Sequence, residues 1–287
     1  MVALSDYREV EAGEWRIFAL NPPWDAKLQT EVLALVRAQA VARHPQTIEV
    51  SHEIDREERH FFLKVFHRTA LLAAVKDQLR RSRAFGSWRQ GLALVAAGFK
   101  APLAIAIGMD SGWRVARREF VLTAQIAGAP LTAYLRRDGT APLPSKREHI
   151  RSLARLIRRF HDAGFVHGDL VPTNIFVLEH GKANLEFCFM DNDRTRRYPS
   201  WLSQSLWKRN LIQLNRMPLP GISLQDRMNF LHAYLNVERL SGADRRFARW
   251  LEARTRQRRQ ECDGADPTVS FRRLMRWAPE IAEAKHV

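Results

Sequence analysis

The sequence predicts an α+β protein whose N-terminal part is rich in strands and whose C-terminal part is helical. Strand-like apolar runs occur before residue 126, and helical periodicity dominates after it. The length of 287 residues suits one or two domains at about 150 residues each. Residues 127–130 (AGAP) interrupt the pattern, so we expect an N-terminal domain over 1–126 and a C-terminal domain over 127–287.

The N-terminal part begins with a weakly patterned region to about residue 20 and continues with alternating helical and strand-like segments. In chain order we expect a helix over 25–43, a hairpin-like strand pair over 46–52 and 60–66, helices over 69–83 and 88–97, and strands over 101–107 and 115–124. The second strand of the pair, HFFLKVF, contains Lys64 among apolar residues.

The C-terminal part begins with a two-faced helix over 146–164. Its apolar side chains share one face: Ile150, Leu153, Ile157 and Phe160. Five arginines lie mostly on the other face, and Gly164 is expected to cap the helix. The segments that follow are short strands over 165–166, 175–178 and 185–190, and arginine-rich helices over 201–287.

Basic residues exceed acidic ones by a wide margin. The chain has 46 Lys and Arg against 31 Asp and Glu, a net charge of +15, and 38 of the basic residues are arginine. This excess indicates an anionic partner, which could be a nucleic acid, a phosphorylated substrate or a membrane surface. No RRM, KH, zinc-finger or OB-fold signature accompanies the charge, so we expect no specific nucleic-acid function.

The two cysteines, Cys188 and Cys262, exclude a disulfide framework, and no Cys/His cluster has the spacing of zinc ligands. The N-terminus has no apolar signal segment, and no run approaches the ~20 apolar residues of a membrane span. We therefore expect a cytoplasmic protein.

The most informative motif is HGDLVPTN, residues 167–174, which follows the helix and Gly164. Seventeen residues after Asn174, Asp191 ends an apolar strand in the sequence MDNDR. A loop and a hairpin thus supply two carboxylates in a fixed order. An ordinary polar surface turn is the alternative interpretation, but it does not account for this succession of elements.

Phosphoryl transfer needs such an arrangement. Asp169 would accept the proton of the attacking hydroxyl and orient it. Asn174 would reach back to a Mg²⁺ ion, and Asp191 would bind Mg²⁺ that bridges the nucleotide phosphates. His167 would brace the loop. Positioning and charge neutralisation would then provide most of the catalysis.

This region resembles the catalytic loop and metal-binding strand of the protein-kinase-like fold. The resemblance implies a bilobal protein that binds ATP. The strand-rich N-lobe, 1–126, would carry a helical N-terminal extension and a hairpin that covers the nucleotide; 127–287 would be the helical C-lobe. Lys64, 105 residues before Asp169, would contact the α- and β-phosphates. Taken alone, it would be an ordinary lysine on a half-exposed strand.

Departures from the protein-kinase signature indicate a different branch of the fold. His-Gly-Asp replaces His-Arg-Asp, and Asp-Asn-Asp replaces Asp-Phe-Gly. HGDL also occurs in aminoglycoside phosphotransferases, whereas D-x-D-R at 191–194 is similar to the bacterial lipopolysaccharide kinases. Further segments resemble that second family: 82–106, 118–135, WKRNLIQLNR and DRMNFLHAYL. The resemblance covers about residues 46–240.

The resemblance implies an ATP-dependent kinase that phosphorylates a heptose or Kdo hydroxyl of the lipopolysaccharide inner core. Its substrate would be the core or a lipid A precursor, and it would work as a peripheral protein on the cytoplasmic face of the inner membrane. Two other functions stay open: another small-molecule kinase, and a catalytically weak pseudokinase that acts as a binding module. No obligate protein partner is implied.

Two of these assignments, the ion-pair partner of Lys64 and the aspartate that binds the metal, have an alternative. The family commonly has a Glu before the Trp of its first long helix, and here that position is Ser87. Lys64 would therefore lack its usual ion-pair partner, unless Asp77 or another carboxylate substitutes. Asp193 could bind the metal in place of Asp191. We favour Asp191, because it ends the strand and is rigidly placed; Asp193 would then cap the following segment.

Most arginines are expected on solvated helix faces. Arg194, Arg196 and Arg197 follow the metal-binding strand directly, and guanidinium groups pair well with phosphate. They are our candidates for contacts to substrate phosphates. The basic stretch at 245–259 has few apolar anchors, so it suits attachment to an anionic membrane surface better than insertion.

Overall fold

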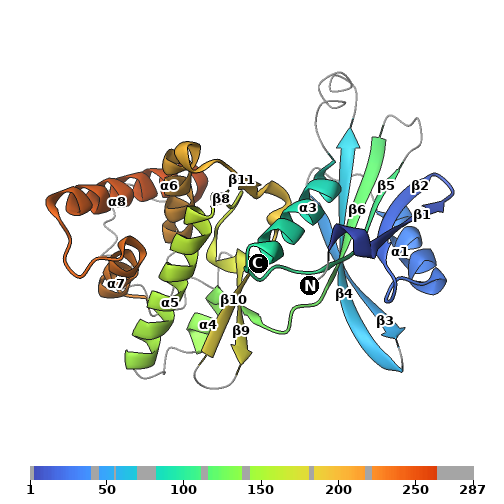
Figure 1. The fold of residues 1–287 in the computed structure, drawn as a ribbon, viewed down its shortest axis with the longest axis horizontal. Helices are drawn as coiled ribbons and strands as arrows, with labels where there is room; N and C mark the ends of the chain where they lie inside the picture. The colour runs from blue at the N-terminus through green and yellow to red at the C-terminus, as the bar shows by residue number, and fades with distance from the viewer. Residues whose placement is uncertain are drawn as a thin grey trace. The chain divides into compact units, whose positions relative to one another are not determined.

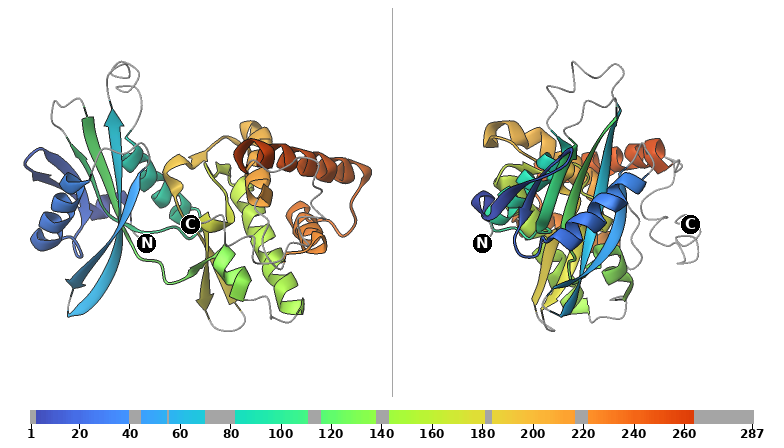
Figure 2. Two further views of the ribbon diagram at one scale, coloured as in Figure 1. Left: turned by 180° about the vertical axis from the view of Figure 1, so that it is seen from behind. Right: turned by 90° about the vertical axis from the view of Figure 1, so that its right-hand side faces the viewer.

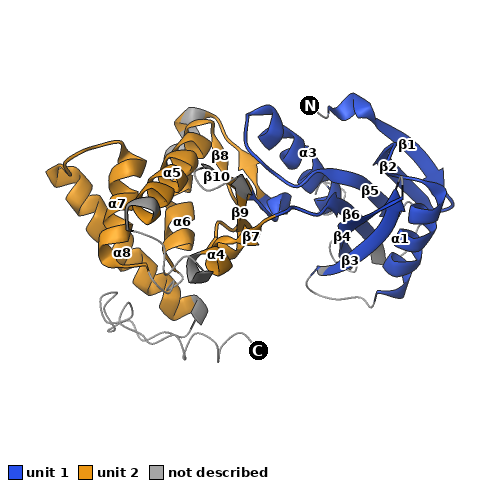
Figure 3. Cartoon of the chain, turned by 90° about the horizontal axis from the view of Figure 1, so that it is seen from below, with its two compact units in different colours: residues 1–127, 189–194 blue, residues 128–188, 195–287 orange. Residues whose placement is uncertain are grey.

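A computed structural model describes residues 3–39, 45–54, 56–69, 82–110, 116–137, 143–180, 184–216 and 222–263. The chain forms two compact units (Figure 3). Unit 1 comprises Met1–Ala127 and Phe189–Arg194, and unit 2 comprises Gly128–Cys188 and Thr195–Val287. The first break falls one residue after the boundary suggested by the sequence. The return of Phe189–Arg194 to unit 1 was not expected, and it makes Asp191 part of the strand-rich unit.

Unit 1 is built on a six-stranded antiparallel sheet of strand order β1-β2-β5-β6-β4-β3 (Figure 1). The strands are β1 Tyr7–Ala12, β2 Trp15–Leu20, β3 Gln46–Ile54, β4 Glu57–Thr69, β5 Ala104–Asp110 and β6 Ala116–Ala124. The short 3₁₀ helix η1, Leu4–Asp6, precedes them. The weakly patterned N-terminal region thus forms a hairpin. Its first strand buries only Tyr7, so the sequence shows little alternation of apolar residues.

Helices α1, Ala26–Ala38, and α3, Arg83–Ala96, cover opposite faces of this sheet (Figures 1 and 2). α1 begins at Asp25, whose carboxylate accepts the Leu28 N–H, and it buries Leu28, Val32 and Val36. α3 buries Trp88, which packs against Tyr7 and Phe18 from the first hairpin. Aromatic contacts therefore connect the N-terminal hairpin to the helix that carries Ser87.

α3 begins five residues before the expected start at residue 88, because the Ser82 hydroxyl caps it by accepting the Phe85 N–H at 3.1 Å. The helix expected over 69–83 is not tested as a whole. β4 continues through Thr69, and residues 70–81 lie outside the described part of the chain.

Unit 2 is mainly helical. Its helices are α4 Leu131–Arg137, α5 Leu143–Asp162, α6 Ser200–Arg216, α7 Leu224–Leu235 and α8 Gly242–Asp263. Its short strands are β7 Ala129–Pro130, β8 Phe165–Val166, β9 Ile175–His180, β10 Asn184–Phe189 and β11 Arg196–Arg197. β10, β9 and β7 form one sheet in that order, and β8 pairs with β11. The described residues contain no helix that is long and apolar enough to cross a membrane.

The two-faced character predicted for α5 is confirmed. Its apolar side chains are all buried: Ile150, Leu153, Ile157 and Phe160. Gly164 follows the helix with a φ of +83°, a conformation that favours glycine. A Cβ atom there would lie 2.3 Å from the Tyr198 carbonyl oxygen, while the Tyr198 N–H donates to the Gly164 carbonyl at 2.8 Å. This close approach directs the chain from α5 into β8 and then into the HGDLVPTN loop.

Candidate active site

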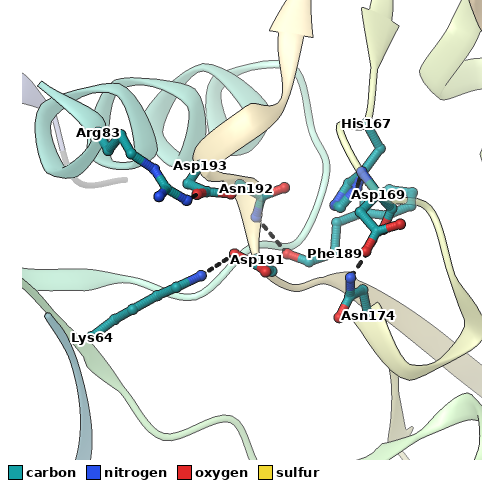
Figure 4. A network of polar contacts seen from close by, with 9 residues as sticks. All are labelled: Lys64, Arg83, His167, Asp169, Asn174, Phe189, Asp191, Asn192 and Asp193. Carbon is teal, nitrogen blue, oxygen red and sulfur yellow. Dashed lines mark hydrogen bonds and ion pairs between the residues drawn. The ribbon is translucent and has the colours of Figure 1, made fainter. Parts of the chain in front are cut away.

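The HGDLVPTN motif forms a tight loop between β8 and β9 (Figure 4). The 3₁₀ helix η3, Pro172–Asn174, closes the loop, and the Asn174 Nδ2 donates to the Asp169 carbonyl at 3.0 Å. Leu170 is fully buried, whereas Asp169 is exposed. The core thus anchors the loop and leaves the carboxylate of Asp169 open to a substrate.

His167 braces the loop from inside, with only 1% of its surface exposed. Its Nδ1 accepts the N–H of Asp169 at 3.1 Å. Because an accepting Nδ1 carries no proton, we assign the ring as the neutral tautomer with its proton on Nε2. His167 therefore orients the backbone of Asp169.

Two side-chain amides of α6 hold the loop from the other side. Asn210 is fully buried; its Oδ1 accepts the His167 N–H at 2.9 Å, and its Nδ2 donates to the His167 carbonyl at 2.7 Å. Gln213 accepts the Leu170 N–H at 3.3 Å and donates to the Gly168 carbonyl at 3.2 Å. The Gln213 Nε2 also lies 3.3 Å from Asp169 Oδ1, so α6 contacts the candidate catalytic carboxylate directly.

A buried histidine supports Asn210 in turn. His161 Nε2 lies 3.2 Å from Asn210 Oδ1, and His161 Nδ1 lies 2.9 Å from the Tyr234 hydroxyl. Burial lowers the pKa of His161 to about 4, only partly opposed by the hydrogen bond to Asn210. The neutral ring can then donate to Asn210 and accept from Tyr234. The loop therefore has a second layer of support that reaches α7.

In unit 1, the Lys64 ammonium forms an ion pair with Asp191 Oδ1 (Figure 4). Lys64 comes from β4, and its ammonium lies 5.5 Å from the centre of the Phe66 ring. Asp191 follows β10 with a φ of +52°, and 40% of its side chain is exposed. The carboxylate is thus accessible while a cation fixes one of its oxygens.

Asp193 has a different environment. Its side chain is only 5% exposed and pairs with the Arg83 guanidinium, which comes from the first turn of α3 and lies 4.7 Å from the Phe66 ring centre. Burial opposes ionisation, but the Arg83 hydrogen bond and the charges of Lys64 and Arg83 outweigh it and lower the pKa of Asp193. Two carboxylates two residues apart are therefore held by two different cations.

These pairs show which carboxylate Lys64 contacts in the absence of a Glu at position 87. The substitute partner of Lys64 in this structure is Asp191, whereas Asp77 lies outside the described residues. α3 presents a cation, Arg83, to the Asp191–Asp193 segment. The buried carboxylate of Glu119 fixes the start of this helix, because it accepts hydrogen bonds from the Ser82 hydroxyl at 2.9 Å and from the Ala84 N–H at 3.2 Å.

The three candidate phosphate-binding arginines lie in two different units. Arg194 ends the 3₁₀ helix η4, Asn192–Arg194, of unit 1, and Arg196 and Arg197 form β11 of unit 2. All three are exposed. Arg197 also has a structural contact, since its guanidinium lies 5.4 Å from the Phe165 ring centre and donates to the Ala163 carbonyl at 3.2 Å. The Arg196 guanidinium likewise donates to the Thr195 carbonyl at 2.8 Å, so Arg194 is the least constrained candidate.

The chain is similar to known proteins of one family. The model of the Lipopolysaccharide kinase (Kdo/WaaP) family matches residues 33–234, more than half of the chain. The chain belongs to the lipopolysaccharide kinase (Kdo/WaaP) family. Since this is a family of kinases, the protein is a phosphotransferase. No curated protein sequence matches the chain.

A solved structure described as WaaP in complex with acyl carrier protein shows the same protein-kinase-like fold. The similarity has a TM-score of 0.57 and 20% sequence identity, and it covers 80% of this chain and 92% of that one. The bilobal kinase-like fold expected from the sequence of this lipopolysaccharide kinase is therefore confirmed.

The structure adds residues that the sequence analysis did not place in the site of this kinase: Arg83, Asn210 and Gln213. A signal for the two amides was present. They are polar residues three positions apart on one side of a helix, and both precede a leucine in RNLIQL. Polar groups on a core-facing side need partners, and here the partners are backbone groups of the loop.

Proposed function

We propose that this kinase transfers the γ-phosphoryl group of ATP to a heptose or Kdo hydroxyl of the lipopolysaccharide inner core. The observation that carries the proposal is the braced HGDLVPTN loop, in which an exposed Asp169 is held by backbone contacts and by Gln213. A carboxylate held in this way can accept a hydroxyl proton without reorganising.

In the proposed reaction, the acceptor oxygen forms a bond to the γ-phosphorus as the bond to the β-phosphate oxygen breaks, so that ADP leaves. Asp169 orients the hydroxyl and takes its proton. Lys64 binds the phosphates. Its partner in the present structure is Asp191, and a phosphate oxygen would replace that carboxylate as its anionic contact.

Asp191 and Asn174 are the proposed ligands of Mg²⁺, which would neutralise charge on the phosphates. The donor chemistry fits, since Mg²⁺ prefers carboxylate and amide oxygens. Of the two candidate aspartates, Asp191 is the accessible one, whereas Asp193 is buried and paired with Arg83. Arg194, Arg196 and Arg197 are proposed to contact phosphates of the acceptor.

We also propose that the kinase acts at the anionic cytoplasmic face of the inner membrane, where a lipid-linked acceptor would be found. The net charge of +15 supports attraction to such a surface.

The test is transfer of labelled γ-phosphate from Mg-ATP to purified lipopolysaccharide fractions that end in heptose or in Kdo. Asp169→Ala should lower transfer about 10³-fold, because it removes the general base, and should leave nucleotide binding intact. Asp191→Ala should weaken Mg²⁺-dependent nucleotide binding. The matched control is Asp162→Asn, an exposed carboxylate on α5 that pairs with Arg158.

The acceptor that takes up label identifies the sugar. Equal transfer by Asp169→Ala and wild type would refute the assigned role. Labelling of a different small acceptor in place of lipopolysaccharide would favour the other small-molecule kinase. Retained Mg-ATP binding without turnover on any acceptor would favour the pseudokinase.

A further inference from the structure

The chain segment that leads from the site into α6 has one sign of charge. Residues 195–225 contain five basic residues and no acidic residue: Arg196, Arg197, Lys208, Arg209 and Arg216. Arg196, Arg197 and Arg209 are exposed. An uninterrupted positive segment of this kind attracts an anionic surface with little internal neutralisation.

Trp201, the second residue of α6, lies within this segment. It is 76% exposed, more than any other large apolar side chain in the described ranges. Exposed tryptophan is unfavourable in water, but it is well suited to the boundary of a bilayer, where an apolar ring and a polar N–H are both satisfied.

A second tryptophan continues this face onto α8. Trp250 is 37% exposed and stacks on Phe247, with ring centroids 5.9 Å apart. The Lys208 ammonium of α6 lies 5.5 Å from the Trp250 ring centre and 6.0 Å from that of Phe247. Lys208 is seven residues after Trp201, so the two share one side of α6. Lys208 therefore lies on the side of α6 that carries Trp201, and it contacts Trp250 of α8.

More exposed arginines surround Trp250 on α8: Arg245, Arg246 and Arg249. The nearby acidic groups are engaged locally. Asp244 accepts hydrogen bonds from Ser241 at the start of α8, and Glu252 pairs with Arg256. The face thus combines two exposed tryptophans with a strong positive charge.

We propose that this surface, which we call the Trp201 face (Trp201, Lys208, Arg209, Arg249 and Trp250), docks on an anionic lipid bilayer. The two tryptophans lie at the level of the headgroups, and the arginines contact lipid phosphates. The proposal deepens the proposed function and rests on it in one respect, namely that a lipid-linked acceptor requires the enzyme at a membrane.

Nucleic acid fits this face less well. A platform that stacks successive bases needs several open aromatic rings, and of the two tryptophans only Trp201 is widely exposed, because Trp250 is stacked on Phe247 and is contacted by Lys208. An interfacial tryptophan needs only part of its ring and its N–H to meet the headgroups. The charge complements a lipid surface without any sequence-reading groove.

The experiment measures flotation of the full chain with phosphatidylglycerol-containing vesicles and with pure phosphatidylcholine vesicles, without nucleotide. We expect binding to the anionic vesicles only, and weaker binding as salt increases. Trp201→Ala should lower the partition coefficient on the order of tenfold. Arg209→Glu should lower it about 25-fold, since each charge near such a surface contributes about a fivefold effect.

Two matched controls lie elsewhere on the chain. Arg155→Glu reverses an arginine that is 62% exposed on α5, and Leu4→Ala removes an apolar side chain that is 55% exposed in unit 1. Both should bind like wild type. Circular dichroism should show that all four variants are folded.

An equal loss of vesicle binding in the control and test variants would overturn the assignment of this face. Vesicle binding that is insensitive to Trp201→Ala and Arg209→Glu would overturn it as well. Absence of vesicle binding together with Trp201-dependent binding to RNA or to an acidic protein would replace the bilayer by that partner. Because the assay uses no ATP, an inactive kinase that still binds vesicles would contradict the proposed function alone. An active kinase that does not bind them would contradict this inference alone.

Discussion

Asn210→Ala should release the catalytic loop from α6. The Asn210 side chain is fully buried and makes two hydrogen bonds to the backbone of His167, at 2.7 and 2.9 Å, one to the His161 ring at 3.2 Å, and one within α6 to Gln213 Oε1 at 3.0 Å. Alanine removes all four hydrogen bonds, three of which join α6 to the loop or to His161, in a buried site that water reaches poorly. At about 1 kcal/mol for each of the three hydrogen bonds that join α6 to the loop or to His161, the loop should be destabilised by about 3 kcal/mol.

Hydrogen–deuterium exchange measures this effect locally. The N–H groups of His167 and Leu170 donate to α6 side chains, so a peptide that spans residues 165–171 reports on the contact. A loss of about 3 kcal/mol corresponds to exchange faster by about two orders of magnitude, if exchange requires the loop to open. A peptide from β4, residues 57–69, should exchange at the wild-type rate.

The control is Asn229→Ala on α7, a partly buried side chain with one weak hydrogen bond to Gln225 at 3.5 Å. This variant should leave the exchange rates of both peptides, 165–171 and 57–69, unchanged. If Asn210→Ala left exchange over 165–171 unchanged, the view that α6 holds the loop would be refuted. Equal acceleration of the β4 peptide would indicate global destabilisation in place of the local effect.

Three further predictions concern the supports of the two carboxylates. Gln213→Leu should lower turnover about tenfold and leave Mg-ATP affinity unchanged, because Gln213 contacts Asp169 and its loop. Steady-state kinetics and nucleotide titration measure the two quantities, and unchanged turnover would contradict the prediction. Arg83→Met should lower the free energy of unfolding by about 1–2 kcal/mol at pH 7, because it removes a cation that pairs with the buried Asp193 carboxylate. Because the pKa of Asp193 is lowered in the folded state, the stability contributed by its ionised form is present above the unfolded pKa and is lost as pH falls. Urea titrations should therefore show the free energies of unfolding of wild type and Arg83→Met converging in acid. A difference that persists in acid would refute the pairing. The pKa of His161 is lowered from 6.5 to about 4, so the unfolded chain binds a proton at a higher pH than the folded protein does. The free energy of unfolding should therefore fall by about 3 kcal/mol as pH decreases from 6.5 to 4. His161→Phe should flatten this dependence of stability on pH, and an unaltered dependence would assign it to another group.

The order and type of most elements could be predicted from the sequence, because they depend on local spacing. The apolar face of α5 and the hairpin of β3 and β4 follow from periods of apolar residues. The HGDLVPTN loop and Asp191 were recognisable for the same reason. Their residue types occur at short fixed separations, and the resemblance of this pattern to the protein-kinase-like fold indicated a kinase.

Elements without a local signal were missed or misplaced. The β1–β2 hairpin carries charged side chains on its exposed face, and its stability comes from pairing with β5 far along the chain. α3 begins earlier than periodicity suggested, because Ser82 and Glu119 together fix its first turn. Glu119 lies on β6, so no local pattern could connect it to the helix.

The sequence by itself determined the kinase-like fold and the candidate residues Lys64, Asp169 and Asp191. Only the tertiary structure decided which groups hold them. Charged side chains find partners by position in space, so a missing Glu at Ser87 did not reveal that Asp191 would pair with Lys64. Nor did spacing show that α6 would supply amides to the loop, since these hydrogen bonds join residues 43 to 45 positions apart.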